Sequence, residues 1–202
     1  RWDLSFPLTA IESMTINAEQ DQVATFTINL MSKASESVTH TVSYAIDNKL
    51  LARHSILKIA DDLAWLDAAS LSCLRSFEIT FNKNLEADTC LSSITPIDYI
   101  NKQFSIEWSF TAVFDDTTYR AMQLDWAKKA IRYSLVDTAT TIWASSNPEL
   151  TIDLPLCSFQ EFSISQGNDE VVTQTLQFKW LYSVEESKAV EVNLVNTTAT
   201  YL

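Results

Sequence analysis

The chain contains a single glycine, Gly167, among 202 residues, where average usage of about 7% would give roughly 14. Glycine supplies the positive φ angles of tight turns and the bare backbone of phosphate-binding loops, so glycine-rich nucleotide motifs are excluded. The turns must then be built from Asn, Asp and Ser. An alternative hypothesis is that some Trp, Ala or Ser positions are glycine in the native protein, which peptide mass spectrometry would decide.

Histidine and cysteine are also scarce, which limits the chemistry available to the chain. The two histidines, His40 and His54, have neither H-E-x-x-H nor C-x-x-C neighbours, so we expect them on the surface or in loops. Cys73, Cys90 and Cys157 are an odd number at irregular spacing, which argues against a secreted disulfide framework and favours small core residues. We predict no catalytic residue, cofactor or metal ligand.

Positive charge is low, with 14 Lys and Arg against 26 Asp and Glu, and the net charge is -12. This balance argues against a protein that grips nucleic acid, because phosphate binding rests on Lys and Arg. No apolar run approaches the roughly 20 residues of a membrane span, and the N-terminus lacks a signal-peptide pattern. We therefore expect a soluble protein made in a cytoplasm. Neighbouring carboxylates such as Asp115 and Asp116 could suggest a glycosidase, but such pairs are more often caps and turns.

The most informative feature that is present is strict alternation between residues 104 and 114, which predicts a strand with one polar face. Its apolar positions are Phe104, Ile106, Trp108, Phe110, Ala112 and Phe114. A short helix should follow, with Asp115 or Asp116 as its N-cap and Tyr119, Met122 and Trp126 on one face. Alternation returns over Lys129–Val136.

Further alternating runs predict about eight strands in all, spaced as in a β-sandwich or barrel flanked by one helix. They lie at 13–17, 23–30, 71–81, 150–154, 159–165, 172–182 and 190–194. We expect a single domain over 1–202, with a loop or hairpin extension around 31–67 where the pattern weakens. Five aromatic residues on the apolar faces could stack on sugars, but core packing is the preferred interpretation: Trp108, Phe110, Phe178, Trp180 and Tyr182.

The order of these elements resembles the tail tube proteins of phages with long, non-contractile tails. Asn101–Tyr119 followed by Lys128–Asp137 carries the resemblance, Pro148–Pro155 and Asp169–Lys179 look like the family's closing strands, and Ser76–Leu85 looks like its central strand. The likeness covers roughly residues 11 to 195. It rests on strand order rather than on a chemical motif.

The resemblance implies a non-enzymatic virion protein of the phage tail, assembled in the host cytoplasm. Its copies would self-assemble into hexameric rings that stack into a tube with other tail proteins. DNA would pass through the lumen into the host without specific binding, which suits an acidic and uncharged-polar lining. Alternatives are the inner tube of a contractile tail or of a related secretion or injection system, a carbohydrate-binding β-sandwich and, last, an enzyme.

Two sets of residues are candidates for roles in such a tube. Acidic residues near predicted strands could form a negatively charged lumen: Asp61, Asp62 and Glu107. Residues of the weakly patterned segment could make contacts between rings: Asn48, Lys49, Arg53 and His54.

Overall fold

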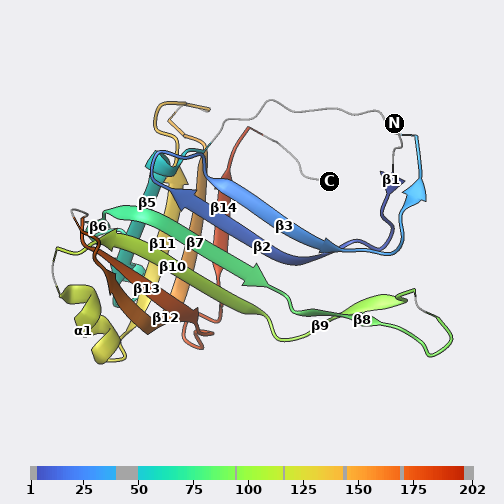
Figure 1. The fold of residues 1–202 in the computed structure, drawn as a ribbon. Coiled ribbons are helices and arrows are strands. Elements are labelled where there is room, and N and C mark those ends of the chain that lie inside the picture. The colour runs from blue at the N-terminus through green and yellow to red at the C-terminus, as the bar shows by residue number, and fades with distance from the viewer. Residues whose placement is uncertain are drawn as a thin grey trace. The chain divides into compact units, whose positions relative to one another are not determined.

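A computed structural model describes residues 4–39, 50–93, 95–115, 117–142, 145–168 and 171–197 (Figure 1). The strands are β1 Leu4–Ser5, β2 Ala10–Glu19, β3 Thr25–Met31, β4 Glu36–Ser37, β5 Ser55–Ala60, β6 Leu71–Ser72, β7 Leu74–Asn82, β8 Leu85–Asp88, β9 Asp98–Asn101, β10 Ser105–Val113, β11 Lys128–Val136, β12 Glu149–Ser165, β13 Thr173–Trp180 and β14 Glu191–Val195. The helices are α1, Thr118–Leu124, and the 3-10 turns η1, Ala52–His54, and η2, Leu63–Trp65. The predicted mainly-β class with one α-helix is confirmed.

Ten of the strands form one sheet, in the order β3-β2-β7-β10-β13-β12-β11-β5-β6, with β14 also paired to β12. The chain divides into two compact units, which are described separately below. Unit 1 comprises 1–16, 26–47 and 80–106, and unit 2 comprises 17–25, 48–79 and 107–202. The single domain expected over 1–202 stays a prediction.

Unit 2 holds an aromatic core. Trp108 lies opposite Phe178 across the antiparallel β10–β13 pair, and their rings stack with centroids 4.1 Å apart. Phe77 of β7 stacks on Tyr133 of β11, with centroids 3.6 Å apart, although these strands are not neighbours in the sheet. The sheet therefore folds over its own apolar side, as in a sandwich or barrel. Trp108 is a well-packed core residue, as its place in the alternation predicts.

Strand β12 runs unbroken from Glu149 to Ser165, where the sequence predicts two strands separated at Pro155. Its pairing explains how a proline is tolerated inside a strand. β14 pairs with β12 only as far as Asp153, β13 pairs from Cys157 onward, and the register with β11 shifts between the partners of Leu154 and Cys157. Pro155 thus lies where no ladder hydrogen bond requires its missing N–H.

Helix α1 is shorter than its sequence pattern suggests. Its N-cap is Thr117 rather than Asp115, while Asp116 lies outside the described residues. The helix ends before Trp126, whose φ is 50°. The N–H groups of Trp126 and Ala127 donate to the carbonyls of Gln123 and Met122 at 3.2 and 3.0 Å, which is the Schellman arrangement that normally has glycine at the left-handed position.

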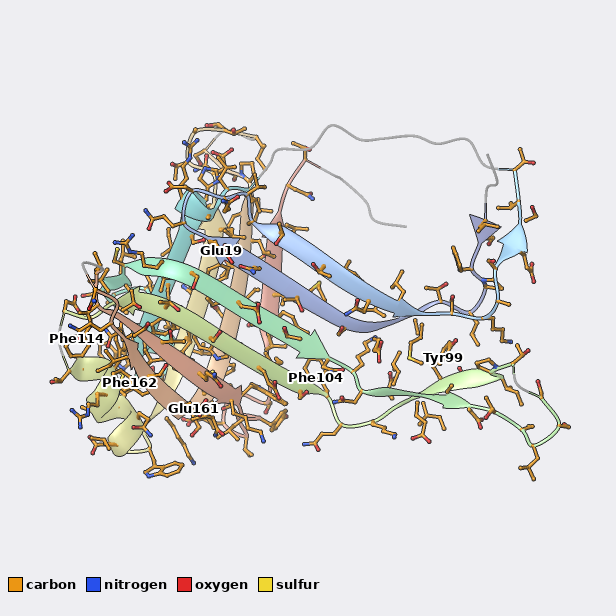
Figure 2. All side chains as sticks on the ribbon, in the orientation of Figure 1. Glu19, Tyr99, Phe104, Phe114, Glu161 and Phe162 are labelled. Carbon is orange, nitrogen blue, oxygen red and sulfur yellow. The ribbon has the colours of Figure 1, made fainter. Side chains whose placement is uncertain are left out.

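Unit 1 consists mainly of narrow ribbons. β1 pairs with β4, and β8 pairs with β9 in a four-residue register from Leu85–Asn101 to Asp88–Asp98. Few of its apolar side chains are buried, and Tyr99 of β9, labelled in Figure 2, is half-buried. Two-stranded ribbons have little room for a core between them, since burial needs a further layer.

Several local expectations need correction. Within the extension predicted around 31–67, Ser55–Ala60 forms β5 and pairs with β11, so this part belongs to the large sheet. The structure does not describe 40–49, which includes His40. Cys157 is buried as expected, but Cys73 and Cys90 are exposed because they lie next to short strands at the surface.

Candidate lumen and subunit-contact surfaces

The three acidic residues predicted to form a lumen do not form one cluster, because Asp61 and Asp62 follow β5 whereas Glu107 lies in β10. Asp61 follows β5 and makes an ion pair with Lys129 of β11. Asp62 caps η2 by accepting a hydrogen bond from the Ala64 N–H at 2.9 Å. Glu107 lies four strands away in β10, directly opposite Lys179. Two of the three negative charges therefore have a cation beside them, and the lumen role stays a prediction.

Glu107 belongs to a polar face of unit 2 on which hydroxyl and amide side chains predominate. The face is formed by the outward positions of β10, β13 and the C-terminal half of β12: Glu107, Ser109, Thr111, Thr173, Thr175, Gln177, Lys179, Glu161, Ser163 and Ser165. Thr111 and Thr175 form a cross-strand hydroxyl pair with oxygens 3.0 Å apart. Alternation separates this face from the core, as Glu161 and its neighbour Phe162 illustrate in Figure 2.

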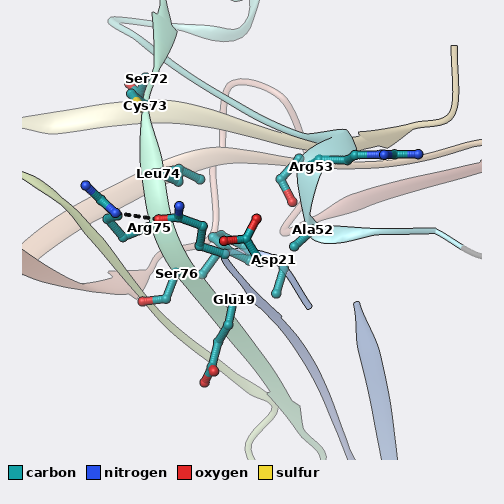
Figure 3. Close-up of a pocket in the computed structure, with 13 residues that line it drawn as sticks. Glu19, Asp21, Ala52, Arg53, Ser72, Cys73, Leu74, Arg75 and Ser76 are labelled. Carbon is teal, nitrogen blue, oxygen red and sulfur yellow. Dashed lines mark hydrogen bonds between the residues drawn. The ribbon is translucent and has the colours of Figure 1, made fainter. Parts of the chain in front are cut away.

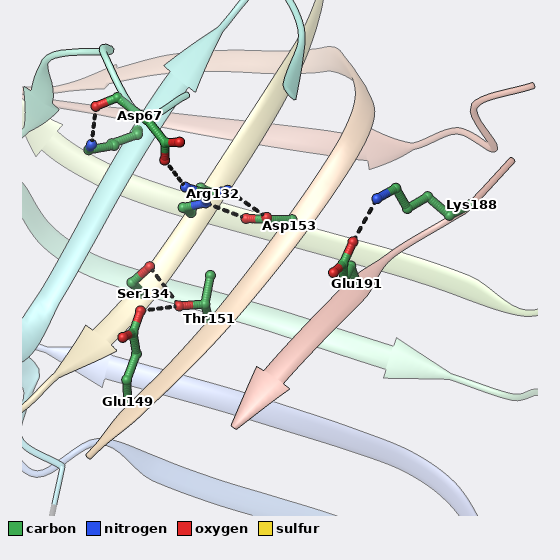
Figure 4. Close-up of polar contacts among 9 residues, drawn as sticks. Asp67, Arg132, Ser134, Glu149, Thr151, Asp153, Lys188 and Glu191 are labelled. Atoms are coloured by element: carbon green, nitrogen blue, oxygen red, sulfur yellow. Dashed lines mark hydrogen bonds and ion pairs between the residues drawn. The ribbon is translucent and has the colours of Figure 1, made fainter. Parts of the chain in front are cut away.

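A second face of unit 2, on β11 and the N-terminal half of β12, is charged and internally paired (Figure 4). Arg132 donates from Nε and Nη2 to the two carboxylate oxygens of Asp153, at 2.7 and 2.8 Å, and from Nη1 to Asp67. The hydrogen bonds that Arg132 donates to Asp153 are the main reason why the pKa of Arg132 is raised. Bidentate pairing of this kind is strong and geometrically specific. The alternation in the sequence could have identified Arg132 and Asp153 as outward-facing residues, because both occupy polar positions of their strands, β11 and β12.

Of the residues predicted to make contacts between rings, the structure describes Arg53 and His54, while Asn48 and Lys49 lie outside the described residues. Only 10% of the His54 side chain is exposed, and Nε2 lies 3.7 Å from Oδ1 of Asp137. The His54 Nδ1 accepts a hydrogen bond from the Leu51 N–H at 3.3 Å. His54 therefore links η1 to the residue that follows β11, a contact that the sequence analysis did not predict. A role of His54 in contacts between rings stays a prediction.

The carboxylate of Asp137 also accepts two hydrogen bonds from the loop that follows β11. The Thr140 hydroxyl donates to one carboxylate oxygen at 2.7 Å and the Ala139 N–H to the other at 3.1 Å. These hydrogen bonds, together with the nearby charges of His54 and Arg53, lower the pKa of Asp137, with the Thr140 bond the largest cause. The Asp137 carboxylate thus organises the loop after β11.

A hollow of about 250 Å³ lies beside η1, between the β2–β3 turn and the start of β7 (Figure 3). Glu19 and Asp21 contribute negative charge, and Arg53 and Arg75 contribute positive charge. Arg75 donates to the Gln20 side chain across it. With balanced charges and no group of three metal-ligating side chains in the described part of the chain, this hollow has no evident chemistry of its own.

Among the described residues, no helix has the length and apolar character that a membrane span requires.

Comparison with known families identifies the class of protein to which the chain belongs. The model of the phage tail tube protein family matches residues 8–180. The chain therefore belongs to the phage tail tube protein family, a family of structural proteins, and the resemblance deduced from strand order is confirmed.

Two solved structures match most of the chain at low identity. The cap that terminates the tube of the anti-feeding prophage shares 13% identity, covering 78% of this chain and 97% of its own, with a TM-score of 0.46. The Hcp protein shares 9% identity, covering 70% and 98%, with a TM-score of 0.37. No curated protein matches the chain.

Proposed function

We propose that this protein is the main subunit of a phage tail tube, in which hexameric rings stack to form the conduit for DNA ejection into the host. The family match over residues 8–180 carries the proposal. The subunit would assemble in the host cytoplasm, associate with other tail proteins and remain in the virion. Its role would be mechanical rather than catalytic.

The surfaces of the molecule support a self-assembling protein. Large apolar side chains remain exposed on strands and ribbons of unit 1, including Phe6, Phe26 and Ile28. A soluble monomer rarely leaves so many in neighbouring positions, because exposed apolar patches favour association. Stacked rings would remove such positions from water.

Electron microscopy of the purified full-length protein tests this function. Hollow tubes with sixfold symmetry are expected, and size-exclusion chromatography with light scattering should show rings or longer assemblies. A protein that stays monomeric at high concentration, under conditions in which it is folded by circular dichroism, would refute the proposal.

We further propose that the polar face around Glu107, on which seven of the ten side chains carry hydroxyl or amide groups, borders the DNA path. Hydroxyl and amide groups offer no fixed positive charge that would hold phosphates, so DNA could slide past them. Lys179 is opposite Glu107 and offsets its charge. The substitution Glu107→Lys should make assembled tubes retain short DNA duplexes at low salt, whereas Glu185→Lys, at an exposed turn position after β13, serves as a matched charge change elsewhere. Equal DNA retention by the two variants would refute this placement.

A further inference from the structure

Strand β3 ends the ten-stranded sheet, and its outer backbone edge has no partner strand among the described residues. The chain just before β3 is occupied, because the Ala24 N–H donates to the Leu50 carbonyl at 3.2 Å. From Thr25 to Met31 no described strand pairs with this edge. Its sequence, TFTINLM, contains neither charge nor proline.

An edge of this kind is unusual for a protein that stays alone. Exposed edge strands present unpaired N–H and C=O groups, and natural proteins usually protect them with lysine, proline, a bulge or a covering segment. The apolar side chains of β3 are also half-exposed, at 46% for Phe26, 49% for Ile28 and 57% for Leu30. They share one face, opposite to Asn29, whose amide donates to Ser13 of β2 at 2.8 Å. Both the backbone and one side-chain face of β3 are therefore poised for a partner.

Strand β14 has a matching edge. It pairs with β12 from Glu191–Asp153 to Val195–Glu149, and no described strand pairs with its other side. Its apolar residues Val192 and Leu194 are 52% and 51% exposed, and only Glu191 carries a charge. That charge is already paired with Lys188. β14 thus repeats the features of β3, with a single charge that is already paired and with alternating half-exposed apolar residues.

We propose that β3 of one copy pairs with the outer edge of β14 of the next copy, so that the sheet continues from subunit to subunit. The inference rests on the proposed tube function and specifies the strands that would join its subunits. A ring requires a head-to-tail contact between two different surfaces, since a contact of β3 with another β3 would close a dimer and stop. The two open edges on different strands meet that requirement, and pairing would cover the apolar side chains of both.

Disulfide trapping tests the pairing. In a background with Cys73→Ser and Cys90→Ser, two double variants combine Asn193→Cys with either Asn29→Cys or Thr27→Cys. Asn29, Thr27 and Asn193 all lie on the polar faces of their strands, so cysteines there face the same side of a joined sheet. After assembly and mild oxidation, at least one double variant should give a ladder of covalently linked chains on a denaturing gel. The single variants should remain monomeric on the same gel.

The outcomes separate this inference from the proposed function. Sixfold tubes that give no ladder with either double variant would overturn the β3–β14 pairing and leave the tube function standing. Cross-linked dimers from Asn29→Cys alone would show β3–β3 pairing and overturn it as well. Absence of tubes in the unmodified protein would refute the function itself.

A charge on the edge provides an independent test that needs no oxidation. Thr27→Lys places an ammonium group on exposed β3, and Ser165→Lys places the same charge at the exposed end of β12 as a control. Thr27→Lys should raise the protein concentration needed for assembly by about tenfold, while circular dichroism stays unchanged. Unaltered assembly of Thr27→Lys, or equal loss in both variants, would contradict the pairing.

Discussion

The two units of the chain use their apolar residues in opposite ways. Among the residues that the structure describes, unit 2 contains 20 of the 23 buried apolar residues, whereas unit 1 contains only three, Ile16, Phe81 and Ile106. Yet half of the 22 large apolar residues that are exposed in the described part of the chain belong to unit 1, which is the smaller unit. Unit 2 therefore buries a core of its own, while unit 1 leaves most of its large apolar residues exposed, which favours association.

A matched pair of phenylalanine truncations should produce the largest contrast between the units. Phe178 is 2% exposed and lies at the centre of the ring cluster, touching Trp108, Phe110 and Phe159. Phe178→Ala should lower the free energy of unfolding by about 3–5 kcal/mol, because it leaves a cavity. Phe26→Ala should change that of the monomer by less than about 0.5 kcal/mol. Urea denaturation measures both, and similar losses would contradict the division.

Phe26→Ala should nevertheless weaken assembly, because the proposed β3–β14 pairing covers Phe26 with a neighbouring copy. Sedimentation of assembled protein would detect this loss, and the stability of the monomer provides the internal control. A Phe26→Ala variant that assembles normally would mean that β3 contributes nothing to the association.

The polar contacts of unit 2 should show a smaller contrast of the same kind. Asp153 is 14% exposed in its side chain and holds Arg132 with two hydrogen bonds, so Asp153→Ala should cost about 2 kcal/mol. Asp61 is 80% exposed, and Asp61→Ala should cost less than about 0.5 kcal/mol despite its ion pair with Lys129. Urea denaturation at two salt concentrations would compare them. Equal losses of unfolding free energy in the two variants would show that the bidentate hydrogen bonds of Asp153 stabilise the charged face no more than an exposed ion pair does.

Alkaline pH should weaken the core of unit 2 through Tyr133. Burial raises the pKa of Tyr133 from 10.0 to about 12, although the Ser55 hydroxyl, 2.9 Å from the phenol oxygen, acts in the opposite direction. The stability contribution is therefore intact below pH 10 and is lost as pH rises through 12, amounting to about 2 kcal/mol by pH 12. Tyr133→Phe should lose less stability than the wild type between pH 9 and 12 in denaturant titrations. Parallel losses in both proteins would exclude Tyr133 as the cause.

Local patterns predicted the strands well, because one face of each is buried in unit 2 and the alternation records that burial. The strand predicted at 104–114 is β10, and the one predicted at 129–136 is β11. The prediction of a strand end at Pro155 was wrong. A proline is tolerated there because β13 and β14 both stop pairing with β12 around this position, and a single strand's sequence does not show where its neighbours stop. Long-range register is not encoded in the composition of one strand.

The candidate surfaces were harder to predict than the strands. Charge alone identifies Asp61 and Glu107 as candidates for a negatively charged lumen. It does not reveal their cationic neighbours, Lys129 and Lys179, because these come from segments distant in sequence. His54 lacked a recognisable motif because its partner Asp137 is 83 positions later. Side-chain partners across a sheet depend on the fold, so a single sequence identifies the residue types but not their pairing.

The last prediction concerns the scarcity of glycine. It tests whether unit 2 draws its stability from its core rather than from its turns. Trp126 has φ 50° after α1, and its side chain is exposed enough to contribute little packing. A residue with a Cβ pays about 1–2 kcal/mol in this left-handed region, so Trp126→Gly should stabilise the protein by about 1 kcal/mol after the entropy cost of glycine. Trp65→Gly is the matched control: Trp65 is also exposed but is not at a positive φ, and glycine there should destabilise by about 0.5–1 kcal/mol. Thermal unfolding measures both changes, and destabilisation by Trp126→Gly would mean that the Trp126 side chain contributes more than its strained backbone costs.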